Sequence, residues 1–384
     1  MPGRTCDRSS VRLTRLGTRE IQRQQVAQPV TRLAPLIAIV LVLVLAMSTT
    51  SVQADAGTPR AGTADAGQST SASAGKQHVP PSIASKSLSG AAPTVFGMSA
   101  SSNAATQSAE SRLGLTAGVV GVFTDWNHPF PTHEELSAKA RGAVLLISWE
   151  PHDSSIPGAN QPLFNLDQIR MGVYDLYING FARAAAATGR PILVRWAPEM
   201  NGDWLPWSTG VNGNGPGDYA STYRYIVDHA RAAGATNIRW VFNPITSYGG
   251  STPLSELYPG DSYVDWAALD GYNWGSLRSW GWQSFTDIFT EGLTEIRSVA
   301  PTKPLAITEL GSAPGPRKPA WITDAFTRAR EAGVRMLVWF ERNKETDWRL
   351  SSDRAAATAA HAAVTAPGWV TGGNYAAIRT ALGL

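Results

Sequence analysis

Two segments of the chain carry an apolar run that leads into a single glutamate. Residues 191–207 read Pro-Ile-Leu-Val-Arg-Trp-Ala-Pro-Glu-Met-Asn-Gly-Asp-Trp-Leu-Pro-Trp, with Glu199 shortly after the apolar residues. Residues 305–312 read Leu-Ala-Ile-Thr-Glu-Leu-Gly-Ser, with Glu309 in the same relation to its apolar run. Two carboxylates that face each other across a cleft can cleave a glycosidic bond, because one protonates the leaving oxygen while the other attacks or assists water.

Eight short apolar segments alternate with longer amphipathic ones and would position the two glutamates. We predict strands at 94–98, 119–123, 143–149, 192–196, 238–242, 266–270, 305–308 and 335–340. We predict helices at 103–113, 134–140, 167–187, 218–233, 285–299 and 321–332. This alternation is typical of a (β/α)8 TIM barrel in the α/β class, and a doubly wound open sheet is the weaker alternative. In a barrel, Glu199 and Glu309 would project from the carboxyl-terminal rim, after strands four and seven.

Aromatic and polar side chains stand at the ends of other predicted strands, on the same rim. Trp204 and Trp207 follow Glu199 in a turn, where large indoles are costly surface unless a flat partner such as a sugar ring covers them. Further candidates on this rim are Trp149, Glu150, Asn243, Asp270, Tyr272, Trp274 and Trp339. Any one of them alone would be ordinary packing, and Glu199 alone could form a core salt bridge with Arg195. Their shared position favours a carbohydrate site.

Charge and tryptophan content separate the N-terminal region from the rest of the chain. All 14 tryptophans lie between Trp126 and Trp369. The formal net charge is +3, but residues 1–54 contribute +5, which leaves −2 for residues 55–384. Nothing in the larger part therefore indicates a nucleic-acid surface, and a near-neutral partner such as a polysaccharide fits better.

Cysteine and histidine usage argues against metal chemistry. Cys6 is the only cysteine, so the chain can form neither an internal disulfide nor a cysteine-based zinc site. None of the six histidines is paired at the helical spacing that metalloproteases use. We expect no metal and no other cofactor at the site, and only a surface calcium on loop carboxylates stays open.

The N-terminal region has the order of a secretory signal. Residues 1–32 are polar and basic, residues 33–47 are an apolar run of 15, and Val52-Gln53-Ala54 offers a small-residue cleavage site. We predict a signal peptide over 1–54 and a secreted, extracellular protein, which would contact the membrane only if the leader stays uncleaved. Residues 55–92 read as a disordered linker rich in Ala, Gly and Ser, and 93–384 as the catalytic domain. We expect a monomer.

The segments around both glutamates resemble those of a known family. Arg195-Trp196-Ala197-Pro198-Glu199-Met200-Asn201-Gly202-Asp203-Trp204 and Ile307-Thr308-Glu309-Leu310-Gly311 are similar to the signature segments of glycoside hydrolase family 26, the β-mannanase family of retaining (β/α)8 glycosidases. The resemblance implies that Glu199 is the general acid/base and Glu309 the nucleophile. It also implies that Arg195 and Tyr272 orient Glu309. The substrate-binding residues that it implies are Arg195, Asn201, Trp204, Trp207, Tyr272, Trp274, Trp339 and Trp149.

One position departs from the family pattern. The β-mannanases usually have histidine before the acid/base glutamate, whereas Pro198 here offers no side-chain hydrogen bond. The sequence therefore predicts a retaining endo-β-glycanase that acts on β-1,4-linked polysaccharide, with β-mannan as the first substrate. Mixed-linkage β-glucan and xylan stay open as alternatives. A non-catalytic barrel that only binds polysaccharide is the rival from another class.

Overall fold

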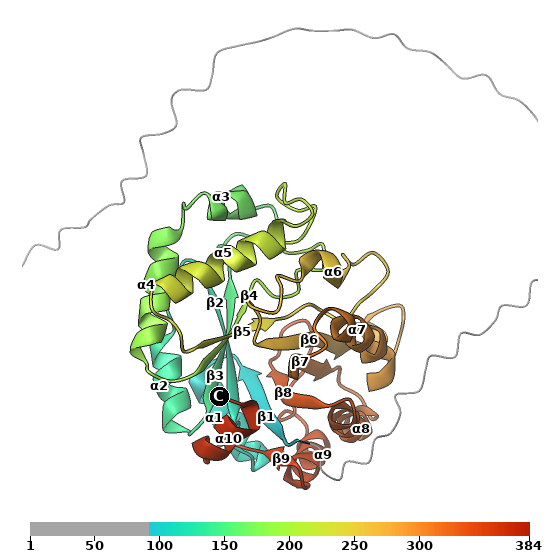
Figure 1. The fold of residues 1–384 in the computed structure, drawn as a ribbon. Coiled ribbons are helices and arrows are strands. Elements are labelled where there is room, and N and C mark those ends of the chain that lie inside the picture. The colour runs from blue at the N-terminus through green and yellow to red at the C-terminus, as the bar shows by residue number, and fades with distance from the viewer. Residues whose placement is uncertain (1–91) are drawn as a thin grey trace, which may run out of the picture. The chain divides into compact units, whose positions relative to one another are not determined.

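Eight parallel strands form a closed barrel within residues 92–384, the part of the chain that this computed structural model describes (Figure 1). The strands are β1 (Thr94–Ala100), β2 (Val119–Asp125), β3 (Val144–Glu150), β4 (Ile192–Trp196), β5 (Ile238–Phe242), β6 (Trp266–Asn273), β7 (Leu305–Ser312) and β8 (Val334–Glu341). They pair in the order β2-β3-β4-β5-β6-β7-β8-β1, and β1 also pairs with β2, which closes the ring. The predicted (β/α)8 barrel is confirmed, and the open-sheet alternative is wrong.

Helices alternate with the strands and cover the outside of the barrel (Figure 1). They are α1 (Asn103–Leu113), α2 (Thr132–Ala140), α3 (Leu166–Arg170), α4 (Asp175–Ala187), α5 (Asp218–Ala232), α6 (Leu254–Leu257), α7 (Phe285–Val299), α8 (Lys318–Glu331), α9 (Arg354–Thr365) and α10 (Tyr375–Leu382). Two short 3-10 helices (Pro162–Phe164 and Gly275–Leu277) and a two-residue strand β9 (Trp369–Val370) complete the elements. None of the helices in residues 92–384 is long and apolar enough to cross a membrane.

One predicted helix, 167–187, is two helices in the structure. α3 ends at Arg170 and α4 begins at Asp175, with Gly172 between them at a φ of 87°. Glycine adopts this left-handed backbone without a steric penalty, and the turn it makes interrupts the helix. The apolar periodicity continues across the break, which is why the sequence pattern does not reveal it.

The barrel interior is filled from the strands and closed by the last helix. A buried cluster joins Val95 of β1, Leu146 of β3 and Val338 of β8 with Ile378 of α10. Parallel strands covered on both faces read as nearly continuous apolar runs, and six of the seven residues of β3 are buried. Because α10 packs at this apolar end, the opposite, carboxyl-terminal rim is left for the polar groups.

Strand β7 is longer than predicted and contains an irregularity at the glutamate. The strand continues past Glu309 to Ser312, and its register against β8 shifts between Ile307 and Leu310. Such a bulge changes the alternation of side chains along a strand. As a result, Thr308 and Glu309, although adjacent in sequence, both turn their side chains toward the same polar cluster.

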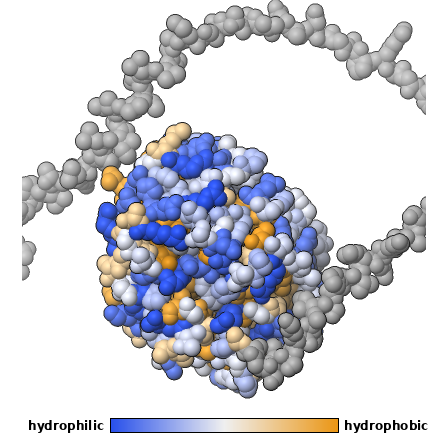
Figure 2. Space-filling view, in the orientation of Figure 1, coloured by the Kyte–Doolittle hydropathy of each residue, from blue (hydrophilic) through white to orange (hydrophobic). Residues whose placement is uncertain are grey.

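The surface is a mixture of polar and apolar residues. Figure 2 shows hydrophobic residues in small patches among hydrophilic ones on the face in view. The predicted signal peptide, 1–54, and the predicted linker up to residue 91 lie outside the described residues.

Candidate active site

Three carboxylates meet at the carboxyl-terminal rim of the barrel. One oxygen from each of Glu199, Asp270 and Glu309 lies within 4.8 Å of the other two. Retaining glycosidases place their two carboxyl groups about 5–5.5 Å apart, whereas inverting enzymes leave about 6.5–9.5 Å for a water molecule. The separation of Glu199 and Glu309 therefore fits direct attack by one of them.

Glu309 is buried and held by two hydrogen-bond donors. The Arg195 guanidinium donates to one carboxylate oxygen, and the Tyr272 hydroxyl donates to the other. Burial raises the pKa of Tyr272, and the negative charge of Glu309 adds to the effect, so the phenol stays protonated and remains a donor. Both donors stabilise negative charge on Glu309 and fix the direction in which it points.

Arg195 is itself fixed by a polar network that lies beneath Glu309. Its Nε donates to the Ser148 hydroxyl at 2.6 Å, and its Nη1 donates to Asn243 at 2.9 Å and to Asp270 at 2.7 Å. The Thr308 hydroxyl bridges the side chains of Asn243 and Asp270 at 2.6 and 2.7 Å. A buried guanidinium needs such partners, because an unpaired charge in the interior is strongly destabilising.

Glu199 lies in a different environment, on a strained turn after β4. Its φ is 56°, and that of Ala197 is 48°, so two residues without a glycine's freedom hold left-handed backbone. The turn is fastened by Ala197 N–H donating to the Trp149 carbonyl at 3.0 Å and Glu199 N–H donating to the Asn243 carbonyl at 2.7 Å. These two bonds come from β3 and the end of β5, on either side of β4, and they direct Glu199 toward Glu309.

The environment of Glu199 favours its protonated form. Burial raises the pKa of Glu199 well above its ordinary value, repulsion from Glu309 and Asp270 raises it further, and the Arg195 charge only partly opposes this. Glu199 has no ion-pair partner among the described residues, and its one side-chain hydrogen bond there comes from the Trp204 indole at 3.3 Å. Glu199 is thus biased toward the protonated form, while Glu309 accepts hydrogen bonds from a guanidinium and a phenol, and this difference suits acid-assisted nucleophilic attack.

Two of the predicted aromatic contacts are accessible at the rim. The Trp204 side chain is 42% exposed and lies beside Tyr248, with ring centroids 6.0 Å apart. Trp274 is partly buried next to Tyr272, and the Arg278 guanidinium lies 4.4 Å from the centre of its ring. Trp204 therefore offers an open indole face directly beside Glu199, while Trp274 is partly covered.

Trp149, Trp207 and Trp339 are fully buried, and the prediction that they contact substrate is wrong. Each indole N–H has an acceptor inside the protein, as buried tryptophans usually do. Trp149 donates to the Tyr177 hydroxyl at 3.0 Å, Trp207 to the Pro198 carbonyl at 2.7 Å, and Trp339 to the Trp348 carbonyl at 3.0 Å. These side chains hold the rim in shape from below.

Asn201 is also a structural residue. Its side-chain amide donates to the Ile245 carbonyl at 3.0 Å and accepts from the Ile245 N–H at 2.9 Å. Both ends of the amide are therefore occupied, and the residue is 1% exposed. The predicted substrate contact is wrong, since Asn201 instead ties the loop after β4 to the loop after β5.

Sequence reasoning identified Asn243 and Asp270 but missed Ser148 and Thr308, the other two residues of the polar layer beneath the glutamates. Asp270 and Asn243 stand at predicted strand ends, but Ser148 and Thr308 lie within apolar runs. Ser148 lies one position before the end of the predicted strand 143–149, and Thr308 is the last residue of the predicted strand 305–308, so a small polar residue at or next to a predicted strand end is the signal that could have found them. In a barrel such residues from different strands reach the same level.

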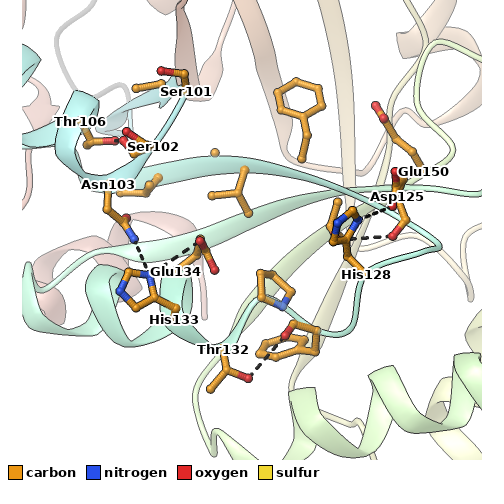
Figure 3. Close-up of a pocket in the computed structure, with 18 of the residues that line it drawn as sticks. Ser101, Ser102, Asn103, Thr106, Asp125, His128, Thr132, His133, Glu134 and Glu150 are labelled. Atoms are coloured by element: carbon orange, nitrogen blue, oxygen red, sulfur yellow. Dashed lines mark hydrogen bonds and ion pairs between the residues drawn. The ribbon is translucent and has the colours of Figure 1, made fainter. Parts of the chain in front are cut away.

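A pocket of about 660 Å³ opens at the carboxyl-terminal rim of the barrel (Figure 3). It is lined by the ends of β1, β2 and β3, by the loops that follow them, and by Arg342 after β8. Asp125 and His128, within hydrogen-bond distance of each other, lie on one side of it. Phe123 joins the pocket to the carboxylates, because the Arg195 guanidinium lies 5.2 Å and that of Arg342 4.5 Å from the centre of its ring.

Comparison with known proteins connects this site to carbohydrate-active enzymes. The family model for glycosyl hydrolase family 26 matches residues 173–328. Endoglucanase H of Acetivibrio thermocellus is 37% identical over 275 residues, which is 69% of this chain and 29% of that protein. A mannan endo-1,4-beta-mannosidase of Bacillus subtilis is 32% identical over 134 residues, 32% of this chain and 31% of that protein. The chain therefore spans less than a third of either relative.

A solved structure supports the fold. The GH26 beta-mannanase of Bacteroides ovatus, BoMan26A, superimposes with a TM-score of 0.58 at 16% sequence identity, over 73% of this chain and 90% of that one. At this identity the similarity concerns the barrel rather than its specificity.

Proposed function

Because this chain belongs to glycoside hydrolase family 26, we propose that it hydrolyses internal bonds of a β-1,4-linked polysaccharide with retention of anomeric configuration. Glu199 is the general acid/base and Glu309 the nucleophile. The observation that carries the proposal is the asymmetry of the two carboxyls, whose oxygens lie within 4.8 Å of each other. Glu309 is bonded by Arg195 and Tyr272, and the pKa of Glu199 is raised by burial.

The reaction proceeds in two displacements. In the first, Glu309 attacks the anomeric carbon while Glu199 gives its proton to the departing glycosidic oxygen, and a covalent glycosyl ester of Glu309 forms. In the second, Glu199 takes a proton from water, and the resulting hydroxide equivalent attacks the same carbon and releases Glu309. Negative charge leaves Glu309 and returns to it, so Arg195 and Tyr272 act on the group whose charge changes.

The surroundings of the carboxyls support cleavage within a chain. Glu199 protonates the leaving group, so Trp204, which donates to Glu199, lies on the leaving-group side. A pocket of about 660 Å³ is bordered by Arg342 and by Phe123, whose ring centre lies 5.2 Å from the Arg195 guanidinium, and we propose that it takes the sugars on the attacked side. Room for sugars on both sides of the reacting bond favours an endo mode.

For the polymer itself, a β-glucan backbone with β-1,4 linkages is favoured over mannan. The similarity to endoglucanase H covers 69% of this chain, about twice the share that the mannosidase covers. Pro198 also lacks the imidazole that the mannanases usually place next to the acid/base residue. Mannan is the second candidate, because three curated mannosidases are 26–32% identical to parts of the chain.

The test is product release from cellulose, mixed-linkage β-glucan, mannan, galactomannan and xylan, with the Glu309→Gln variant as control. Oligosaccharides from mixed-linkage glucan with the parent protein and none with the variant would support the proposal. Release from mannan alone would reverse the choice of polymer. Binding of a polymer without any cleavage would instead support the hypothesis that the protein is a non-catalytic, polysaccharide-binding barrel.

We further propose that the protein is secreted after cleavage near Ala54. The basic region, the apolar run of 15 residues and Val52-Gln53-Ala54 support this. N-terminal sequencing of protein from the culture medium of an expressing bacterium tests it. Residue 55 at or near the new terminus is expected, and retention of full-length chain in the membrane fraction would contradict the proposal.

A further inference from the structure

Lys318, the first residue of α8, is a buried cation outside the carboxylate cluster. The residue is 2% exposed, and its ammonium donates to the carbonyl oxygens of Asp347, Trp348 and Arg349 at 3.2, 3.0 and 2.9 Å. A buried charge is costly, and a cation at the N-terminus of a helix opposes the helix dipole. The three carbonyls offset that cost, so the lysine and the turn that it binds depend on each other.

A buried carboxylate binds the backbone N–H groups of the same turn. The carboxylate of Glu341, at the end of β8, accepts from the N–H of Leu350 at 2.8 Å and from that of Ser351 at 3.1 Å. Glu341 is 3% exposed. The five-residue turn from Asp347 to Ser351 is therefore fastened at its carbonyls by a buried cation and at its amides by a buried anion.

This turn carries Trp348, which packs directly beneath the machinery for Glu309. The Trp348 ring lies 4.9 Å from that of Tyr272 and 4.9 Å, nearly perpendicular, from that of Trp274. Gly311 leaves room for the contact, since a Cβ there would lie 3.1 Å from Trp348 and 2.9 Å from Tyr272. Tyr272 in turn donates to Glu309.

We propose that Lys318 is a positioning residue for Glu309, which acts by fixing the 347–349 carbonyls, the Trp348 indole and, through it, the Tyr272 hydroxyl. Its role in catalysis rests on the proposed function of Glu309 as nucleophile. Its role in holding the tryptophan does not, and can be measured separately.

The ammonium also makes the arrangement sensitive to pH. Burial lowers the pKa of Lys318 to about 8, against the attraction of Asp347, Glu341 and Asp353, while Arg349 lowers it further. Below that pH the group has three protons for three carbonyls. Above it the neutral amine has two, so one of the three hydrogen bonds is lost, although the Trp348 carbonyl keeps the Trp339 indole and the Arg349 carbonyl keeps the Ser352 hydroxyl as donors.

The first experiment is a double-mutant cycle on mixed-linkage glucan, or on whichever polymer the protein cleaves. We expect Lys318→Met to lower kcat on the order of tenfold with KM nearly unchanged. The double variant Lys318→Met/Tyr272→Phe should have nearly the same kcat as Tyr272→Phe alone, because Lys318 acts on Glu309 through the Tyr272 hydroxyl. Lys303→Met is the matched control, since Lys303 also donates to a backbone carbonyl, at 2.7 Å, but on the exposed surface. Multiplicative losses in the double variant would overturn the proposal.

The second experiment needs no activity. Near-ultraviolet circular dichroism of the parent protein should change between pH 7 and 9 with a midpoint near 8, and the change should be absent in Lys318→Met and present in Lys303→Met. The far-ultraviolet spectrum should stay the same. If no polymer is cleaved, the proposed function fails, but this measurement still shows whether Lys318 fixes the position of Trp348. If the near-ultraviolet spectrum of Lys318→Met at pH 7 is the same as that of the parent protein, the positioning role is overturned.

Discussion

Gly202 lies directly against the indole of Trp204, so closely that a Cβ at residue 202 would be 2.5 Å from the ring. The spacing Glu-x-x-Gly-x-Trp thus has a physical cause. The glycine gives the indole room to fold back over the chain. In this position the indole N–H of Trp204 donates to the Glu199 carboxyl at 3.3 Å. No side chain larger than hydrogen keeps that contact in place.

Gly202→Ala is therefore expected to displace Trp204 and to lower kcat/KM on the order of 10-fold to 100-fold, because small misplacements at a reacting centre are costly. Gly180→Ala is the matched control. A Cβ at Gly180 meets nothing within 4 Å, and alanine in the interior of α4 should stabilise the fold by about 0.5–1 kcal/mol without affecting activity. Kinetics and thermal unfolding of both variants check this, and normal turnover by Gly202→Ala would contradict it.

Replacing the two glutamates should change stability in opposite directions at neutral pH. Burial and the neighbouring carboxylates raise the folded-state pKa of Glu199 above that of the unfolded chain. The folded protein then holds a proton that the unfolded chain has lost, so stability falls as pH rises above about 4.3 toward the folded pKa. Glu199→Gln removes this effect and should raise Tm by a few degrees at pH 7 and hardly at all near pH 4.

Glu309→Gln should instead lower Tm at pH 7, because Arg195 loses the charge of one of its two carboxylate partners. Differential scanning calorimetry of both variants between pH 4 and pH 8 makes the comparison. A Tm for Glu199→Gln that stays below that of the parent protein at every pH would refute the argument.

The assigned roles of the carboxyls can be separated with a leaving group that needs no proton. On a dinitrophenyl β-glycoside, Glu199→Ala should still form the glycosyl ester, whereas on a polysaccharide it should lose about 10²–10⁴-fold in rate. Glu309→Gln should fail on both substrates, since no nucleophile remains. Stopped-flow release of dinitrophenolate measures the first step. Equal losses by both variants on the activated substrate would mean that the roles are misassigned.

Two tryptophans three residues apart should respond differently to truncation. Trp204→Ala removes an exposed face together with the hydrogen bond to Glu199, so it should lower kcat/KM on the order of 10-fold to 100-fold, as Gly202→Ala does, with little change in stability. Trp207→Ala empties a buried site and should cost about 3–5 kcal/mol of unfolding free energy. Urea unfolding and initial-rate kinetics distinguish them, and a KM effect from Trp207→Ala at full stability would count against its buried role.

The barrel and its two glutamates follow from the sequence because both depend on local patterns. Apolar runs of strand length separated by amphipathic segments predict the (β/α)8 order, and strand ends predict the rim. The burial of Trp207 does not follow, because a turn tryptophan reads as exposed until the Pro198 carbonyl is seen to accept its N–H. Lys318 is hidden for the same reason, since its three acceptors lie about 30 residues away along the chain.

The left-handed backbone at Ala197 and Glu199 has a consequence for refolding. Each such residue costs about 1–2 kcal/mol, and the turn is held by bonds from the Trp149 and Asn243 carbonyls on neighbouring strands. Before β3, β4 and β5 are joined, nothing compels the chain to adopt it. The proton donor therefore takes up its place only after these strands assemble, and recovered activity after denaturation would report the completed barrel rather than the first compact form of the chain.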